Sequence, residues 1–238
     1  MKITQLIDTR PKKVLWAAGF VLIFAAVFLI QEPIIGPGDT VVINYTISLN
    51  GVIIDTSIEE IAHRADIFDQ ERTYEPLVIM IGGTPGESAV APYAVERELL
   101  GMRVGEKKTV RLYPYEAYGY FDQSKLLEMD KEEFIRDSGI ENLEEGQTYQ
   151  MGTLVFTIYE VTEDMVKLDF NHRFAVIANE VVIPREEFEK TAQVYVGNEV
   201  SYQGQRAIVI RFTDTEVILD VNPSVFEFVV EIIQIRKV

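Results

Sequence analysis

The chain has 238 residues, an apolar fraction of 47% and a formal net charge of −16. It is long enough for one or two buried cores, and because it has no cysteine, disulfides and thiolate metal sites are excluded. A nucleic-acid partner is not expected, because a polyanion is bound by lysine and arginine clusters that this acidic sequence lacks. The only histidines are His63 and His172, and no phosphate loop or zinc-protease motif is found. We therefore expect neither a metal site nor a cofactor.

The N-terminal segment predicts a membrane anchor. Basic residues dominate positions 1–13, and an uninterrupted apolar run follows from Val14 to Ile30. At about 1.5 Å per residue this run reaches about 25 Å, which is short but sufficient for a bilayer core. A cleaved signal peptide and a buried soluble helix are alternatives, although no small-residue cleavage pattern follows Ile30.

The charge bias on one side of this run sets an expected orientation. The positive-inside rule places a tail over 1–13 in the cytoplasm, a transmembrane anchor over 14–31, and the folded domains outside the cytoplasm. The prediction is thus a single-pass protein of the cell membrane, with the lipid bilayer as one partner.

A short linker and a hairpin come next. Residues 32–38 contain two prolines and two glycines and predict a helix-breaking linker. From Thr40, β-branched residues lie on both sides of Asn50 and Gly51, the strongest short hairpin signal. Residues 58–76 are charged and without strand pattern, so they are expected to be a surface excursion.

The next elements lead to a tyrosine beside a glycine. A strand is predicted over 77–83, and a short amphipathic helix over 95–102. An alternating strand over 108–112 follows, and then a proline and a loop carrying Tyr118 and Gly119. Such a strand can place one phenol at the rim of an apolar pocket.

These segments together resemble the FKBP-type peptidyl-prolyl cis-trans isomerases. The motifs that follow in family order are GDTVVINYTISLNGVIIDTS, LVIMIGG, ERELLGMRVGEKKTVRL and YPYEAYG, and FEFVVEIIQI resembles the closing strand. The resemblance implies an α+β fold, in which an antiparallel sheet wraps around a short helix. The isomerase domain would comprise residues 39–122 and 223–238.

Residues 123–222 interrupt that domain and are similar to the insert-in-flap chaperone domain of SlyD-type and long archaeal members. The similarity includes the tetrad DFNH, which ends at His172, and alternation predicts a mostly β insert. A segment ending at Asn171 can be laid over one ending at Asn222. The insert is therefore either a duplication over 123–180 and 181–222 or two convergent strand-turn-strand units.

The resemblance also implies the site. Amide rotation needs an apolar cup with a few polar groups, and no nucleophile or metal, because the barrier comes from resonance in the C–N bond. The implied catalytic residues are Tyr45, Asp55 and Tyr118, with Tyr118 donating to a substrate carbonyl and Asp55 polarising the amide region or fixing Tyr45. The implied substrate-binding residues are Ile54, Leu77, Val90, Ala91, Val95 and Phe228.

Three features complicate this assignment. Taken singly, Tyr45, Ile54 and Phe228 would be ordinary core residues of strands. The pocket tryptophan of well-known members is replaced by an aliphatic residue near Val95, because Trp16 is the only tryptophan. The loop before the helix is long, so the positions of Val90 and Ala91 are fixed only to within one residue. His172 is expected to be a structural turn residue.

The resulting hypothesis is a membrane-anchored peptidyl-prolyl cis-trans isomerase with a fused chaperone insert, which assists the folding of extracytoplasmic proteins. Its partners would be unfolded or proline-containing polypeptides. The alternative is a catalytically weak or inactive chaperone or binding module of the same fold.

Overall fold

The computed structural model describes residues 33–82, 93–152 and 154–238. Within these residues the chain forms three antiparallel sheets, and each has its own apolar cluster. The longest helix described has eight residues. The predicted α+β class is therefore wrong, because the described chain is mostly β and its α-helices are short, with four to eight residues each.

The predicted tail over 1–13 and anchor over 14–31 lie outside the described residues. Within the described ranges, none of the helices is long and apolar enough to cross a bilayer, which requires about 20 residues. This finding contradicts two predictions, namely the transmembrane helix in the predicted fold and the predicted location as a single-pass protein of the cell membrane.

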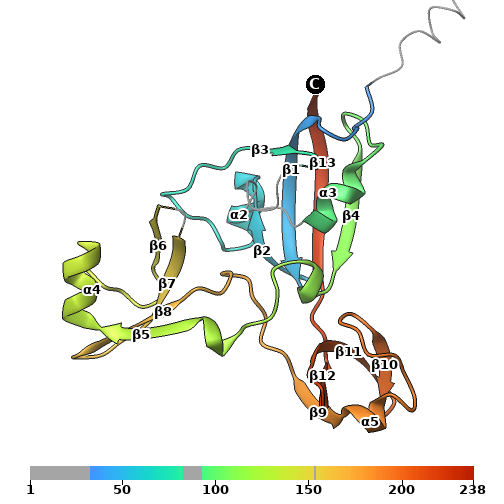
Figure 1. Cartoon of the computed structure of the whole chain (residues 1–238). Helices are drawn as coiled ribbons and strands as arrows, with labels where there is room; N and C mark the ends of the chain where they lie inside the picture. Colours follow the sequence, from blue (N-terminus) through green and yellow to red (C-terminus); the bar gives the residue numbers. More distant parts are fainter. Residues whose placement is uncertain (1–32, 83–92, 153) are drawn as a thin grey trace, which may run out of the picture.

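The first sheet is organised around two long strands, β1 (Thr40–Leu49) and β13 (Phe226–Arg236), which pair along their whole length. The other edge of β13 pairs with β4 (Lys107–Leu112), and β1 pairs with both β2 (Val52–Thr56) and β3 (Leu77–Met80). Figure 1 shows β1 and β13 side by side. Because every second residue of β1 is buried, its alternating pattern places one face in the core.

Short helices flank this sheet. Helix α3 (Tyr93–Leu99) buries Val95 and Leu99 in the core of the first sheet. The segment 58–76, predicted as a surface excursion, instead contains α2 (Glu59–Arg64), which buries Ala62. Its single buried position explains why no apolar periodicity marked this helix in the sequence.

The predicted hairpin between β1 and β2 is observed, with Asn50 and Gly51 both at positive φ. These are the backbone angles that a two-residue hairpin turn of type I′ requires.

The first insert unit is a four-stranded sheet with one helix. Its strand order is β5-β8-β7-β6. The elements are β5 (Leu126–Asp130), α4 (Lys131–Ser138), β6 (Thr148–Met151), β7 (Leu154–Val161) and β8 (Met165–Asp169). Two 3-10 turns precede it, η1 (Pro114–Glu116) and η2 (Gln123–Lys125). Its core consists of Phe134, Phe156, Ile158, Val166 and Leu168.

The second insert unit has the same plan. Its strand order is β9-β12-β11-β10. The elements are β9 (Glu180–Pro184), α5 (Arg185–Phe188), β10 (Glu199–Tyr202), β11 (Gln205–Phe212) and β12 (Glu216–Asp220). Its core consists of Phe188, Ala207, Val209, Val217 and Leu219. Figure 1 shows the two units on different sides of the lower end of the first sheet.

The two insert units also share irregular details. The central strand pair of the first unit shifts register just after Ile158, and that of the second unit just after Val209, which lies 51 positions later. The Gly146 N–H donates to the Ile158 carbonyl at 2.7 Å, and the Gly197 N–H to the Val209 carbonyl at 2.8 Å. A β-bulge occupies a specific position in a sheet. The two units therefore share a bulge and a turn at matching positions, as well as the strand order.

The units differ in what covers their outer faces. Ile208 and Ile210 are buried in the second unit, and Ile210 faces a cavity that it shares with Tyr115 and Tyr120. In the first unit the position that matches Ile210 is Tyr159, which is 49% exposed. The second unit is docked on the loop after β4, where Gly197 lies directly against the Tyr115 ring, whereas Tyr159 of the first unit stays half exposed and meets Phe121 of that loop only at 6.2 Å between ring centroids.

Candidate functional site

A buried carboxylate marks the site at the end of β2. Asp55 is 1% exposed, and its Oδ1 accepts the Thr56 N–H at 2.7 Å and a hydrogen bond from Arg72 Nη1. Its Oδ2 accepts from Arg173 Nη2 at 2.8 Å. A buried charge is tolerated only when it is paired and hydrogen-bonded, and these two guanidinium groups satisfy both conditions.

Tyr45 lies next to this carboxylate, on the neighbouring strand β1. Its hydroxyl is 3.5 Å from Asp55 Oδ2 and accepts a hydrogen bond from Arg72 Nη2 at 2.9 Å. Burial raises the pKa of the Tyr45 phenol, and the negative charge of Asp55 raises it further. Tyr45 is therefore a protonated phenol at neutral pH, and Arg72 joins it to Asp55.

Tyr118 is placed by the tight loop after β4. Gly119, at a φ of +81°, turns the chain there and donates its N–H to the Pro114 carbonyl at 2.7 Å. The Tyr118 ring stacks on His172 at 4.2 Å between centroids and meets Phe226 edge-on at 5.3 Å. Burial raises the pKa of the Tyr118 phenol strongly. The phenol therefore keeps its proton well above neutral pH.

The predicted apolar residues lie in or against the core of the first sheet. Val95 and Phe228 are 1% and 2% exposed, and Ile54 and Leu77 pack against the same cluster half-buried. The predicted residues Val90 and Ala91 lie outside the described residues. The structure thus gathers Tyr45, Ile54, Leu77, Val95, Tyr118 and Phe228 in or against one cluster. Their role in binding stays a prediction.

A cavity of about 600 Å³ opens over Asp55 and Tyr118. Its opposite wall belongs to the first insert unit, through Val155, Phe156 and Thr157 of β7. The segment after β8 supplies more of the lining, with the consecutive residues Phe170, Asn171, His172, Arg173 and Phe174. Of the predicted site residues described, only Asp55 and Tyr118 line this cavity.

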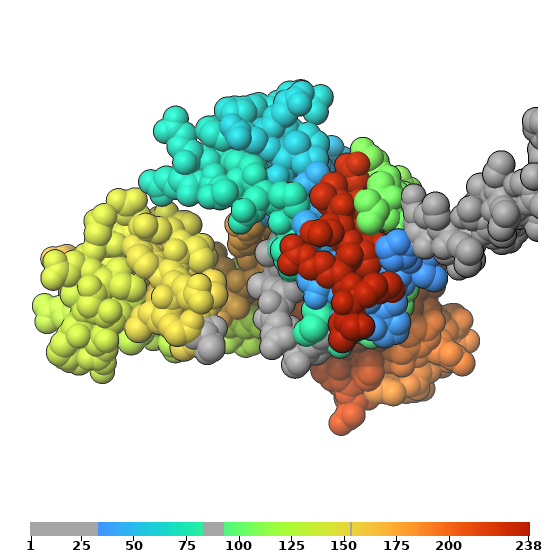
Figure 2. Space-filling view, turned by 90° about the horizontal axis from the view of Figure 1, so that it is seen from above, coloured from blue at the N-terminus to red at the C-terminus, as the bar shows by residue number. Residues whose placement is uncertain are grey.

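The two chain segments that enter and leave the first insert unit are joined beside the cavity. The Asp122 N–H donates to Asn171 Oδ1 at 2.9 Å, and Asn171 Nδ2 donates to the Asp122 carbonyl at 3.0 Å. Tyr120 and Val176 pair as a parallel bridge. Figures 1 and 2 show the segment between β2 and β3 reaching toward the first insert unit on another side.

Sequence reasoning missed three side chains of the site. Arg72 lies in the segment 58–76, where no pattern marked it, and Arg173 follows the DFNH tetrad without a signal of its own. His172 accepts the Phe174 N–H at Nδ1, as a turn residue does, but its ring also stacks on Tyr118. Within the described ranges no group of three or more His, Asp or Glu side chains lies together as a metal site would.

Comparison with known proteins shows which family the chain belongs to. No family model matches the sequence. A short-type peptidyl-prolyl cis-trans isomerase from Methanocaldococcus jannaschii is 39% identical over 142 residues, which are 60% of this chain and 86% of the relative. The chain belongs to the FKBP-type peptidyl-prolyl cis-trans isomerases.

Two bacterial members of the family carry the name SlyD. The SlyD protein of Aeromonas hydrophila is 32% identical over 59% of this chain and 58% of its own length. The SlyD protein of Helicobacter pylori is 30% identical over 47% of this chain and 58% of its own length. The resemblance to SlyD-like FKBP-type isomerases in the sequence is thus confirmed.

Proposed function

We propose that this chain catalyses cis-trans isomerisation of peptide bonds that precede proline in polypeptide clients, and that its first insert unit holds the client next to the site. The observation that carries this proposal is the shared cavity, which has Asp55 and Tyr118 on one wall and Val155 of the first insert unit on the other. Family membership supports the reaction, and the cavity supports the coupling of capture to catalysis.

The proposed mechanism needs no covalent step. An X-Pro bond exchanges slowly because rotation breaks amide resonance, at a barrier of about 18–20 kcal/mol. Leaving water lowers the barrier, because the twisted amide has less charge separation than the planar one. Tyr118 would donate a hydrogen bond to a carbonyl of the client, and its raised pKa keeps it a donor.

Asp55 and Tyr45 would act as one polar wall of the site. Arg72 ties their oxygens together, and the carboxylate is buried beneath the cavity. Such fixed dipoles stabilise a twisted amide without the reorganisation that water would require.

We also propose the domain limits predicted above, with an isomerase domain over 39–122 and 223–238 and an insert over 123–222. We infer that the insert arose by duplication. The common strand order, the matching bulge and the matching glycine turn support this over convergence. Strand β9 begins at Glu180, one residue before the predicted start of the second repeat at 181, so we propose that the second repeat includes this residue.

The first insert unit would capture apolar client segments, and two strands leave side chains for this purpose. Exposed apolar side chains of β6 and β7 are Met151, Leu154, Val155 and Tyr159. Holding a client there raises the effective concentration of its prolines at the catalytic site.

A protease-coupled assay on proline-containing peptides tests the reaction. We expect Tyr118→Phe to lower kcat/KM about two- to tenfold, the factor that one hydrogen bond of about 0.5–1.5 kcal/mol supplies. Asp55→Asn is expected to lower it as well. Tyr195→Phe is the matched control, because that tyrosine is 52% exposed on the second unit. Unchanged catalysis in both site variants would contradict the assignment.

A binding module with weak catalysis is the second candidate. It is favoured by one observation, namely that Arg173 reaches over the cavity to Asp55 while His172 covers Tyr118. In that case the full chain would suppress aggregation of an unfolded protein, and peptide isomerisation would stay at or only slightly above the uncatalysed rate.

A further inference from the structure

We propose that the site selects clients with an acidic side chain next to the proline, and that Arg173 and Lys125 determine this preference. The inference rests on the isomerase function proposed above and names the substrate class of the same cavity. The cavity carries positive charge, whereas the whole chain has a negative net charge.

Arg173 is the first of the two cations. Its Nη2 pairs with Asp55 Oδ2 at 2.8 Å, yet its side chain is 57% exposed, whereas that of Asp55 is 1% exposed. Its guanidinium lies 4.5 Å from the centre of the Phe174 ring, which holds it over the cavity. Because an arginine has five N–H donors, Arg173 can keep its bond to Asp55 and still donate to a client carboxylate.

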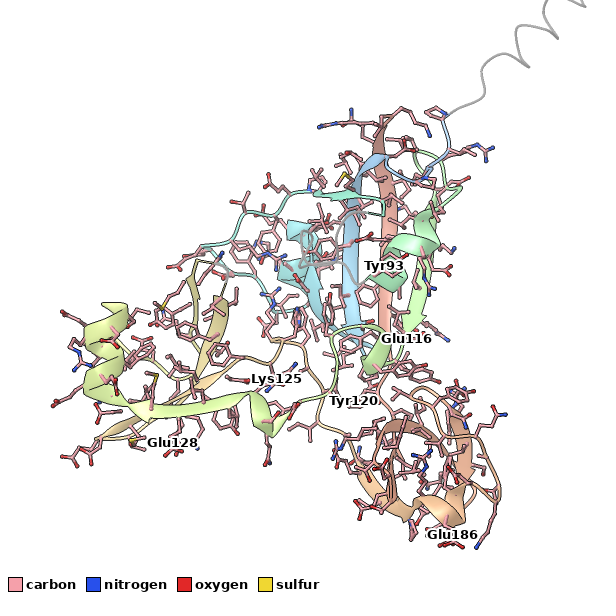
Figure 3. The ribbon with its side chains drawn as sticks, in the orientation of Figure 1. Tyr93, Glu116, Tyr120, Lys125, Glu128 and Glu186 are labelled. Atoms are coloured by element: carbon pink, nitrogen blue, oxygen red, sulfur yellow. The ribbon has the colours of Figure 1, made fainter. Side chains whose placement is uncertain are left out.

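Lys125 is the second cation. It is exposed at the end of η2 and lines the same cavity, and Figure 3 shows it between the first insert unit and the isomerase sheet. No salt bridge of Lys125 is found among the residues that the structure describes. The positive charge of Lys125 helps to lower the pKa of Asp122, so the two side chains interact electrostatically. The hydrogen bonds of the Asp122 carboxylate, however, come from Ser124, which donates two of them where Asp122 caps η2.

Positively charged side chains outnumber negatively charged ones in the lining of the cavity. Asp55 is the one acidic side chain in the lining, and its Oδ1 is paired with Arg72, which is not part of the lining. Arg173 and Lys125 are therefore positive charges in excess over the wall. The chain as a whole has a net charge of −16, so this cavity attracts anions within a molecule that otherwise repels them.

A client residue beside its proline would lie against this wall while Tyr118 contacts the backbone. A unit charge pair about 4 Å apart in water changes an equilibrium about fivefold. We therefore expect about a fivefold preference for Glu-Pro over Gln-Pro in kcat/KM, and a disadvantage of similar size for Lys-Pro. Both differences should shrink as salt is added, because these cations are exposed.

The test uses the full chain and three peptides that differ only at the residue before proline, namely Glu, Gln or Lys. Isomerisation rates and dissociation constants are measured on each. Arg173→Gln and Lys125→Gln should each bring the Glu-Pro and Lys-Pro values together, and Lys125→Glu should reverse their order. Lys190→Gln is the control, because it removes an exposed charge on the second insert unit.

The outcomes separate the inference from the function on which it rests. Equal rates and affinities for the three peptides, with catalysis present, would overturn the charge preference alone. A drop of the same factor for all three peptides in Arg173→Gln and in Lys125→Glu would assign these residues a structural role and overturn it too. If no peptide were isomerised, the proposed reaction would fail, and the affinity ratio would still decide the charge preference.

Discussion

Replacing Gly197 with alanine tests whether the second insert unit is docked on the loop that carries Tyr118. Gly197 has a φ of +90°, and an added Cβ would come within 2.8 Å of the Tyr115 ring. Gly146 is the matching glycine of the first insert unit, at a φ of +84°, and an added Cβ there has no heavy atom within 4 Å. The two substitutions therefore share the backbone change and differ in the contact with the isomerase domain.

The expected magnitudes follow from these contacts. An alanine in the left-handed region costs about 1–2 kcal/mol at either position. At Gly197 the overlap with Tyr115 adds about 1–3 kcal/mol, the usual cost of an extra methyl group in a packed contact. Because the ring belongs to another unit, the second insert unit can relieve this overlap by moving away from the loop.

Two measurements on the full chain distinguish these effects. Denaturant unfolding followed by circular dichroism should show a larger loss of stability in Gly197→Ala than in Gly146→Ala. Hydrogen exchange detected by mass spectrometry should show faster exchange over residues 113–121 in Gly197→Ala alone. Equal stability losses with unchanged exchange over 113–121 in both variants would refute the docking of the second unit.

Two further predictions concern the protonation of Tyr118 and the hydrogen bonds between Asn171 and Asp122 beside the cavity. Burial raises the pKa of the Tyr118 phenol above its ordinary value of 10.0, so the unfolded chain loses this proton first as the pH rises. The contribution of the phenol to folding stability is therefore complete below pH 10. Above pH 10 it declines by about 1.4 kcal/mol per pH unit. Alkaline unfolding should accordingly be less steep in Tyr118→Phe, and an unchanged slope would contradict the buried phenol. Asn171→Ala removes both hydrogen bonds to Asp122, so amide hydrogen exchange at Asp122 should accelerate by about 10-fold or more. Asn222→Ala, at the matching position of the second unit, should leave that exchange rate unchanged. Slow exchange at Asp122 in both variants would contradict the hydrogen-bonded contact between Asn171 and Asp122.

Local sequence patterns predicted much of the first sheet. Asn50 and Gly51 specify a turn by their backbone preferences, and the alternation in the segments around it specifies which face is buried. The helix over 95–102 was predicted near its observed position, although the structure ends it at Leu99. These features depend on residues that are close in sequence, and a single sequence contains that information.

The contacts around Asp55 could not be predicted in the same way. Arg72 is 17 residues from Asp55, and Arg173 is 118 residues away. Neither arginine lies in a periodic segment, so nothing in the sequence distinguishes it from a solvated surface charge. The pairing arises only when the β2–β3 segment and the chain leaving the first insert unit meet at the end of β2.

The different packing of the two insert units could not be predicted from the sequence either. Their sequences can be aligned, but the alignment does not tell which unit packs on the loop after β4. That depends on Tyr115 and Tyr120, which lie outside both units, and on Ile210, which is matched by Tyr159 in the first unit. Tertiary contacts therefore distinguish two units whose strand patterns are alike.

The central claim is that one cavity joins client capture to catalysis, and a pair of valine substitutions tests it most directly. Val155 lines the cavity from the first insert unit and is 54% exposed; Val182, on β9 of the second unit, is 53% exposed. The measurement is a ratio of two catalysed rates, namely the rate of proline-limited refolding of a protein client divided by the isomerisation rate of a short peptide. We predict that Val155→Ser lowers this ratio and Val182→Ser does not, whereas equal ratios in both variants and in the unaltered chain would contradict the claim.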